Sequence, residues 1–398
     1  MEPRRVRMKL PGMIHLSLHV VAMLPTLLVL RFQRAMFLAQ RLPLRCKVVH
    51  VGGVEGHDEI LDRMPPCDPS RAGVACAFVR ARLIVTVIAA PLLAASTSGS
   101  TSPAVARVHE DRIRVGSASL YVREVGRGRP IIVLHGGPDF DLGYLLPDLD
   151  RLADRYHLIY YDQRGRGRSA DNVLATDVSL TSDLADLEQV QQHVGFDSTA
   201  VLGHSWGAVL ALEYALRHPQ RVSQLVLMNP APVSTRDLAL FRAAYLKSLG
   251  ADMDRQRQIV ATDAYKRADP ETVAARYRIH FEHALQRPQD YEKLMATMKA
   301  GFIRQGPDGI LKARAAEDAL MRDTWDVDGY DLLPKLHDLA IPTLVLTGEH
   351  DFIPTDVAAH IAQAMPHARL ATLKDCGHFA FLERPDDVRR ALDGFFRP

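Results

Sequence analysis

Short apolar runs alternate with helical patterns from Arg107 onward, and this alternation constrains the fold more than any other feature of the sequence. Strands that alternate with helices predict a mostly parallel sheet covered by helices on both faces. Between about residues 231 and 335 the strand signals stop, and charged and apolar residues fall at helical spacing. The sequence therefore predicts an α/β fold with an inserted helical cap. The expected strands are 112–115, 120–124, 131–135, 158–162, 200–203, 224–229, 343–348 and 369–373, and the expected helices include 179–193, 206–217 and 385–396.

The charge of the chain changes near residue 106. Residues 1–106 carry 13 Lys and Arg against six Asp and Glu, whereas the following 292 residues carry 36 against 41. We therefore treat the basic segment separately. In the rest of the chain, the strand and helix patterns indicate that 107–230 and 337–398 are the two parts of the core and that 231–336 is the cap. The acidic balance of the main body gives no electrostatic reason to expect a nucleic-acid partner.

The basic segment contains a pattern typical of a signal peptide. Two arginines, Arg80 and Arg82, precede an apolar stretch at 83–95, and small residues follow it up to 106. We interpret 79–106 as a signal-peptide-like segment and linker, which predicts export to the periplasm or the exterior. We interpret 1–78 as an extension with a mis-assigned start.

An N-terminal membrane anchor is the alternative for this segment. The uncharged stretch 10–30 is long enough to cross a bilayer. On that interpretation the protein is membrane-anchored, and without either signal it is cytoplasmic. Membrane contact is expected only through this N-terminal segment.

A serine lies between an apolar run and a helical pattern in the stretch G-H-S-W-G at 203–207. The G-x-S-x-G pattern is typical of a nucleophile elbow, in which a strained strand-to-helix turn exposes the serine oxygen. The alternative is a tight turn that contains a serine with no catalytic role. A serine hydroxyl needs a base to become a good nucleophile, and the base needs an orienting acid.

Candidates for the acid and the base follow two later strands. Asp351 follows the strand 343–348, and His378 follows the strand 369–373, so both are expected at the carboxyl edge that also carries Ser205. The order Ser, Asp, His is the order found with G-x-S-x-G elbows. The sequence predicts a Ser205–His378–Asp351 triad, with Glu349 as a rival acid.

The strand 131–135 leads into the sequence H-G-G-P, which is a candidate oxyanion loop. The expected donors are the backbone N–H groups of Gly137 and of Trp206, the residue after the nucleophile. We interpret His135 as a structural residue. The arginine-rich stretch 160–172 is interpreted as a structural turn with buried charge pairing, because Gly165 and Gly167 favour a turn and Asp162 and Asp171 partly balance the arginines. It is not a phosphate loop, because it lacks the following lysine and helix start.

Metal and cofactor motifs are not found in the sequence. The four cysteines (Cys46, Cys67, Cys76 and Cys376) form no C-x-x-C pair. We therefore expect a reaction that uses no metal and no cofactor.

The motifs H-G-G-P, D-Q-R-G-R-G-R-S and G-H-S-W-G together resemble the α/β-hydrolase superfamily, and within it the prolyl aminopeptidase (proline iminopeptidase) group. The resemblance spans 108–397 and implies Ser205 as nucleophile, Asp351 as acid, His378 as base, and Gly137 and Trp206 as oxyanion donors. Two residues depart from the group's pattern, because Asp139 and His204 stand where the group has glycine. The resemblance also implies a helical cap with acidic side chains that hold the substrate amine, and Glu282 is a candidate for this role.

These observations predict a serine hydrolase that acts through an acyl-enzyme on a small ester, amide or N-terminal peptide bond. The best single prediction is a prolyl-type aminopeptidase, and a carboxylesterase or lactonase is the alternative. A non-catalytic ligand receptor on the same fold is an alternative of a different class. The expected partner is a small-molecule or short-peptide substrate, and the sequence does not indicate an oligomeric state.

Overall fold

A computed structural model of the protein describes residues 107–397. The predicted signal-peptide-like segment and the extension before it lie outside the described residues. Among the helices of the described part, none is both long enough and apolar enough to span a membrane.

Eight strands form one sheet in the order β1-β2-β4-β3-β5-β6-β7-β8. The first two strands run antiparallel to their neighbours, and all pairs from β4 to β8 are parallel. The prediction of a mostly parallel sheet is therefore confirmed. The strands are β1 (Val108–Val115), β2 (Ala118–Val125), β3 (Arg129–Leu134), β4 (Tyr156–Tyr161), β5 (Thr199–His204), β6 (Val222–Met228), β7 (Thr343–Gly348) and β8 (Ala368–Leu373).

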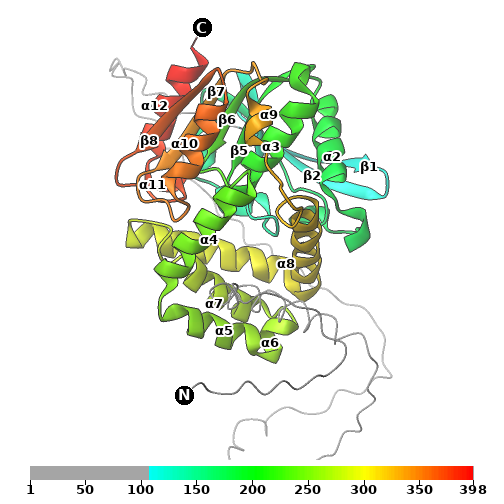
Figure 1. Ribbon diagram of the computed structural model, residues 1–398. Coiled ribbons are helices and arrows are strands. Elements are labelled where there is room, and N and C mark those ends of the chain that lie inside the picture. The colour runs from blue at the N-terminus through cyan, green and yellow to red at the C-terminus, as the bar shows by residue number, and fades with distance from the viewer. Residues whose placement is uncertain (1–106, 398) are drawn as a thin grey trace, which may run out of the picture. The chain divides into compact units, whose positions relative to one another are not determined.

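Helices cover both faces of this sheet (Figure 1). The core helices are α2 (Leu180–His193), α3 (Trp206–Arg217), α10 (Thr355–Ala364), α11 (Ala380–Glu383) and α12 (Pro385–Phe396). Helices α2, α3 and α10 contribute to one apolar core, and α11 and α12 contribute to the other. Short 3-10 helices lie at Leu142–Leu145, Leu149–Leu152, Gly167–Ser169, Ala175–Asp177 and Pro219–Arg221.

The last four residues of β3, 131–134, form an uninterrupted apolar run. Ile131 and Val133 belong to the core on one face, whereas Ile132 and Leu134 belong to the core on the other face. A strand buried on both faces has no polar side to show, which is typical of a central parallel strand.

The chain between β6 and β7 is helical, and Figure 1 shows α4 to α8 gathered on one side of the sheet. The two ends of this segment lie side by side, because Ser234 near its start and Asp331 near its end form an isolated antiparallel bridge. Helix α8 contains a break at Gly306, which has a non-helical φ of 65° and is followed in the chain by Pro307. The helices are α4 (Thr235–Leu249), α5 (Asp252–Ala261), α6 (Asp263–Lys266), α7 (Pro270–His280), α8 (Pro288–Asp323) and α9 (Leu333–Leu336).

The arginine-rich turn after β4 is pinned by buried ion pairs. Arg166 pairs with Asp183 and Arg164 with Asp186, and both aspartates lie on α2. Asp162 accepts backbone N–H bonds from Leu142 and Arg168. The predicted structural turn is present, but the main partners of its arginines come from a helix that follows the turn.

We expect Asp183→Ala to lower the free energy of unfolding by about 3–5 kcal/mol, because it leaves the fully buried Arg166 guanidinium without its counter-charge. Denaturant unfolding measures this change. Asp254→Ala, which removes the partner of Arg257 in an exposed pair, is the control and should cost at most about 0.5 kcal/mol. Equal losses in the two variants would contradict the role assigned to the buried pair.

Candidate active site

Ser205 lies at a strained corner between β5 and α3. Its φ of 54° and ψ of −117° are a backbone conformation that non-glycine residues rarely adopt. The Ser205 N–H donates to the carbonyl oxygen of Met228 at 3.0 Å, which fixes the corner against the next strand. A Cβ on Gly203 would lie 2.2 Å from the carbonyl oxygen of Gly207, so the strand and helix can approach closely only with glycine there. This geometry is that of a nucleophile elbow.

The loops after β7 and β8 bring Asp351 and His378 into contact. His378 Nδ1 lies 2.9 Å from Asp351 Oδ1, and both side chains are almost fully buried. The N–H of Ile353 also donates to Asp351 Oδ1, at 2.9 Å. The other carboxylate oxygen of Asp351 accepts a hydrogen bond from Asn229 Nδ2 at 2.7 Å. Asp351 is therefore held by donors on both of its oxygens.

Asn229 is a residue of this site that the sequence did not single out. It follows β6, and its Nδ2 also donates to the carbonyl oxygen of Gly377, beside His378. Asn229 has a φ of 48° and is fully buried. A polar residue directly after an apolar strand was the available signal, but its partners could not be inferred from sequence.

Ser205 and His378 line the same cavity, and the contact of His378 Nδ1 with Asp351 leaves Nε2 free to face the serine. Within the described residues, no hydrogen bond joins Ser205 Oγ to the imidazole. Catalytic hydrogen bonds often shorten only when substrate binds. The structure therefore brings Ser205 to the cavity that His378 also lines, while the Nδ1 atom of His378 contacts Asp351.

The loop after β3 brings Gly137 to the wall of this cavity. Gly137 has a φ of 50°, and a Cβ there would lie 2.2 Å from the Phe140 ring, so the loop needs glycine at this position. Trp206 also lines the cavity and is the first residue of α3, where helix N–H groups have no intrahelical acceptor. Both predicted oxyanion donors therefore lie at the cavity that holds Ser205.

The cavity has a volume of about 150 Å³ and is lined by residues of both the core and the cap. This volume is below that of a typical pocket for a drug-sized ligand, so it suits a small acyl group. Nine of its 21 lining residues are aromatic: Phe140, Tyr144, Trp206, Phe241, Tyr277, Phe281, Trp325, Phe352 and Phe379.

Three charged side chains interrupt the aromatic lining. Asp139 from the oxyanion loop accepts a hydrogen bond from Tyr277 Oη, and Arg276 and Glu317 line the cavity from α7 and α8. Burial and the neighbouring carboxylate of Asp139 raise the pKa of Glu317 to about 8, against the opposing charge of Arg276. Burial also raises the pKa of Asp139. The cavity therefore presents two carboxyl groups and one guanidinium to a ligand.

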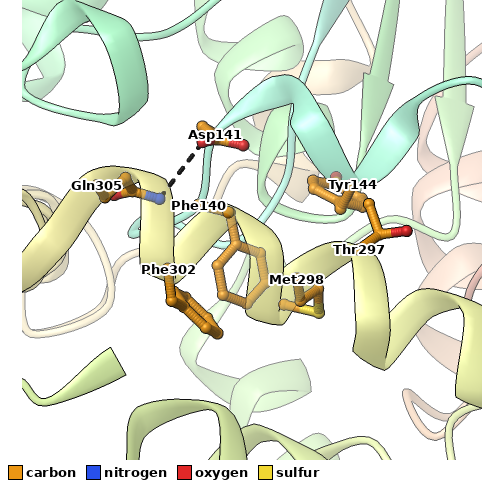
Figure 2. A pocket seen from close by; sticks show the side chains of 8 residues that line it. Phe140, Asp141, Tyr144, Thr297, Met298, Phe302 and Gln305 are labelled. Atoms are coloured by element: carbon orange, nitrogen blue, oxygen red, sulfur yellow. Dashed lines mark hydrogen bonds between the residues drawn. The ribbon is translucent and has the colours of Figure 1, made fainter. Parts of the chain in front are cut away.

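A smaller hollow of about 20 Å³ lies between the loop after β3 and helix α8. Figure 2 shows Phe140 and Tyr144 facing Met298 and Phe302 across it, with Gln305 bonded to Asp141. Asp141 also pairs with Arg304 Nη2 at 2.8 Å. These contacts attach the oxyanion loop to the cap.

Two candidates from the sequence lie elsewhere. Glu349, the rival acid, is exposed and does not contact His378, so Asp351 is the carboxylate at the imidazole. Glu282 is also exposed and does not line the cavity. The helix expected to continue through it ends at His280, and Glu282 lies in the turn that follows. Glu317, which lines the cavity from α8, was missed.

His135 forms hydrogen bonds that hold two loops together, which agrees with the structural role expected for it. Its Nε2 accepts the N–H of Gln163 at 3.1 Å, and its carbonyl oxygen accepts from Gln163 Nε2 at 2.9 Å. Burial and the charge of Arg166 lower the pKa of His135 to about 3. The residue is a neutral hydrogen-bond partner between two loops.

A group that could hold a metal ion lies outside the cavity. Ligand atoms of Glu349, His350 and Asp375 lie within 4.8 Å of one another, and all three residues are exposed. None of them lines the cavity. The serine site therefore contains no such group among the described residues.

Comparison with known proteins agrees with this geometry. Residues 129–385 match the family model described as alpha/beta hydrolase fold. The proline iminopeptidase of Xanthomonas citri is 30% identical over 302 residues, which cover 70% of this chain and 93% of that protein. The proline iminopeptidase of Heyndrickxia coagulans is 26% identical over 275 residues, which cover 68% and 92%.

A solved structure described as "Est816 as an N-Acyl homoserine lactone degrading enzyme" is also similar. Its TM-score is 0.54 at 25% identity, and the alignment covers 72% of this chain and all of that one. The family match covers more than half of the chain, and the elbow, sheet order and site geometry agree with it. The chain belongs to the α/β-hydrolase fold family and is a hydrolytic enzyme that resembles the prolyl aminopeptidases.

Proposed function

We propose that the protein is a serine hydrolase that removes an N-terminal residue, with proline favoured, from short peptides or amides. The single observation that carries the proposal is the shared cavity: it holds Ser205 and His378 together with the two carboxyl groups of Asp139 and Glu317. Similarity to proline iminopeptidases supports the same substrate class.

In the proposed reaction Ser205 Oγ attacks the substrate carbonyl carbon while His378 Nε2 takes the hydroxyl proton. The oxyanion of the tetrahedral intermediate accepts hydrogen bonds from the N–H groups of Gly137 and Trp206. When the C–N bond breaks, His378 gives the proton to the leaving amine, and an acyl-enzyme remains on Ser205. Water then attacks the ester with His378 as base, which releases the carboxylic acid and restores Ser205. Asp351 orients His378 throughout.

Glu317 and Asp139 are the proposed partners of the substrate ammonium group. A unit charge pair at about 4 Å gains about 4 kcal/mol at an effective dielectric near 20, before desolvation is subtracted. The cavity of about 150 Å³ admits one small residue, which suits proline. An exposed carboxylate such as that of Glu282 could not provide this energy in water.

Arg276 favours one alternative, an esterase or lactonase. Its guanidinium lines the same wall as the two carboxyl groups. The positive charge of Arg276 opposes part of the pKa increase that burial causes in both groups, and it offsets part of their negative charge. A nearly neutral wall with aromatic surroundings would suit an uncharged acyl group. The dependence of turnover on a free substrate amine distinguishes the two functions.

We expect proline p-nitroanilide to be hydrolysed, and its N-acetyl form to lose at least about tenfold in kcat/KM, which corresponds to about 1.4 kcal/mol. Glu317→Gln should remove most of this difference, because the amide carries no charge. Glu282→Gln changes the same residue type at an exposed cap position and should leave the difference intact. Rapid cleavage of p-nitrophenyl esters with no dependence on a free amine would overturn the peptidase assignment and leave the serine mechanism in place.

The pH dependence gives this prediction a second readout. Glu317 is neutral below its pKa of about 8 and gains negative charge as pH rises through it. The ratio of kcat/KM for the free-amine substrate to that for the N-acetyl substrate should therefore rise toward pH 8. It should fall above that, where the substrate amine, with an ordinary pKa of about 8, loses its charge. In Glu317→Gln the rising part should be absent.

A further inference from the structure

Three buried hydrogen bonds join the loop after β3 to the loop after β8 by way of the residue before the nucleophile. The N–H of Gly136 donates to Tyr144 Oη at 2.6 Å. Tyr144 Oη lies 2.7 Å from His204 Nδ1, and His204 Nε2 lies 3.0 Å from the carbonyl oxygen of His378. The side chains of Tyr144 and His204 are buried. The path therefore touches each of the three segments that carry the proposed oxyanion loop, nucleophile and base.

The protons along this path have one consistent arrangement. A backbone N–H only donates, so Tyr144 Oη accepts from Gly136 and directs its own proton to His204 Nδ1. His204 Nδ1 is then unprotonated, and its Nε2–H donates to the carbonyl oxygen of His378, which only accepts. This arrangement needs a neutral imidazole, and burial together with the charge of His378 lowers the pKa of His204 to about 3.

Aromatic neighbours hold both side chains in place. The His204 ring lies 5.4 Å from Phe381 and 5.6 Å from Phe379, centroid to centroid. The Tyr144 ring lies 5.8 Å from Phe140 in an edge-to-face arrangement. A side chain that is packed on several sides moves little, so it keeps its two hydrogen-bond partners at a fixed distance from each other.

We infer that Tyr144 and His204 are positioning residues that hold the oxyanion loop and the catalytic histidine at a fixed spacing around Ser205. The inference rests on the proposed roles of Ser205, His378 and Gly137. The Gly136 N–H is committed to Tyr144, so the next N–H, that of Gly137, is the one left for the oxyanion. Displacement of either end by about 1 Å would misalign the attack, and errors of that size cost about 100-fold in rate.

The path between the two loops depends on the side chain of His204. The prolyl aminopeptidase pattern has glycine at this position, and a glycine could reach neither Tyr144 nor the His378 carbonyl. Tyr144 and His204 both line the cavity, yet their polar atoms are engaged with each other and with the backbone. Their expected effect is therefore on the rate of the chemical step and not on substrate affinity.

The experiment compares Tyr144→Phe, His204→Ala and the double variant with the wild-type enzyme on the best substrate. Each single variant should lower kcat by about 10- to 100-fold and change KM by no more than about threefold, because alignment and not binding is lost. The double variant should be no more than about twofold slower than the slower single variant, because either change breaks the same path. Independent, multiplying effects would overturn the inference, as would losses confined to KM.

Tyr156→Phe is the matched control for stability. Tyr156 is also a buried tyrosine, and its part-buried hydroxyl has one side-chain partner, Asp393 at 2.6 Å, but it lies outside the cavity. This variant should lower the melting temperature by about as much as Tyr144→Phe while keeping wild-type kcat. An equal fall of kcat in Tyr156→Phe would show that the Tyr144 effect is general destabilisation and would overturn the inference. A wild-type protein that hydrolyses none of the substrates would instead count against the proposed function itself.

Discussion

Ser205→Ala is expected to lower kcat by about 10⁴- to 10⁶-fold, the loss seen when a serine nucleophile is removed. The alanine keeps the Cβ, so the strained backbone at φ 54° and the packing of the elbow remain. Folding and the KM for substrate should therefore change little. Steady-state kinetics measures the loss after the background rate of a control without the enzyme is subtracted. Circular dichroism checks the fold.

The His378→Ala variant provides the internal check on this result. If Ser205 and His378 act as one unit, the double variant is little slower than either single variant. Residual activity well above the uncatalysed rate would then come from the oxyanion donors alone. A Ser205→Ala protein with wild-type kcat would remove Ser205 from the mechanism.

Asp351→Asn is expected to lower kcat by about 10³- to 10⁴-fold. Asp351 Oδ1 accepts from His378 Nδ1 at 2.9 Å and from the Ile353 N–H, and the asparagine would favour the wrong imidazole tautomer. The other oxygen keeps its bond from Asn229 only if the amide is oriented to accept it. The variant should fold, because the substitution preserves size and shape.

Glu349→Gln is the matched control for Asp351→Asn, since it neutralises a carboxylate two residues away on the same strand end. Glu349 is exposed and does not contact His378, so kcat should stay within about twofold of wild type. Both proteins should be assayed from pH 5 to 9. Loss of turnover in Glu349→Gln with Asp351→Asn active would mean that the acid has been assigned to the wrong residue.

The sequence predicted the sheet and the three candidate catalytic residues because both follow local rules. Each strand is an apolar run with clear ends, and the carboxyl ends of parallel strands lie on one edge. Ser205, Asp351 and His378 each follow such a run, so their convergence required only the strand order to be compatible.

The supporting residues depend on contacts between distant segments and could not be predicted in the same way. Asn229 ends an apolar run, but its contact with Asp351 depends on β6 and β7 being neighbours. Glu317 is one of many carboxylates in the cap, and only the packing of the segment after Gly306 turns it toward Asp139. The ion pairs of Asp183 and Asp186 with the arginine-rich turn likewise could not be predicted, because they depend on how α2 packs beside the turn.

The path through Tyr144 and His204 shows the same limit. From the sequence, His204 was recognised only as a departure from the prolyl aminopeptidase pattern. Its partners lie 60 and 174 residues away in the chain, at Tyr144 and at the carbonyl group of His378. Local propensity carries no information about such contacts.

Covalent labelling with a fluorophosphonate tests directly whether Ser205 is an activated nucleophile. The reagent phosphonylates a serine only where a base and an oxyanion site assist the attack, so it also separates an enzyme from a non-catalytic receptor. We expect one adduct per active protein, located by peptide mass spectrometry at Ser205, with much slower labelling in Asp351→Asn and none at that peptide in Ser205→Ala. Catalytically active protein that gains no label at Ser205, or gains it elsewhere, would show that Ser205 is not the nucleophile.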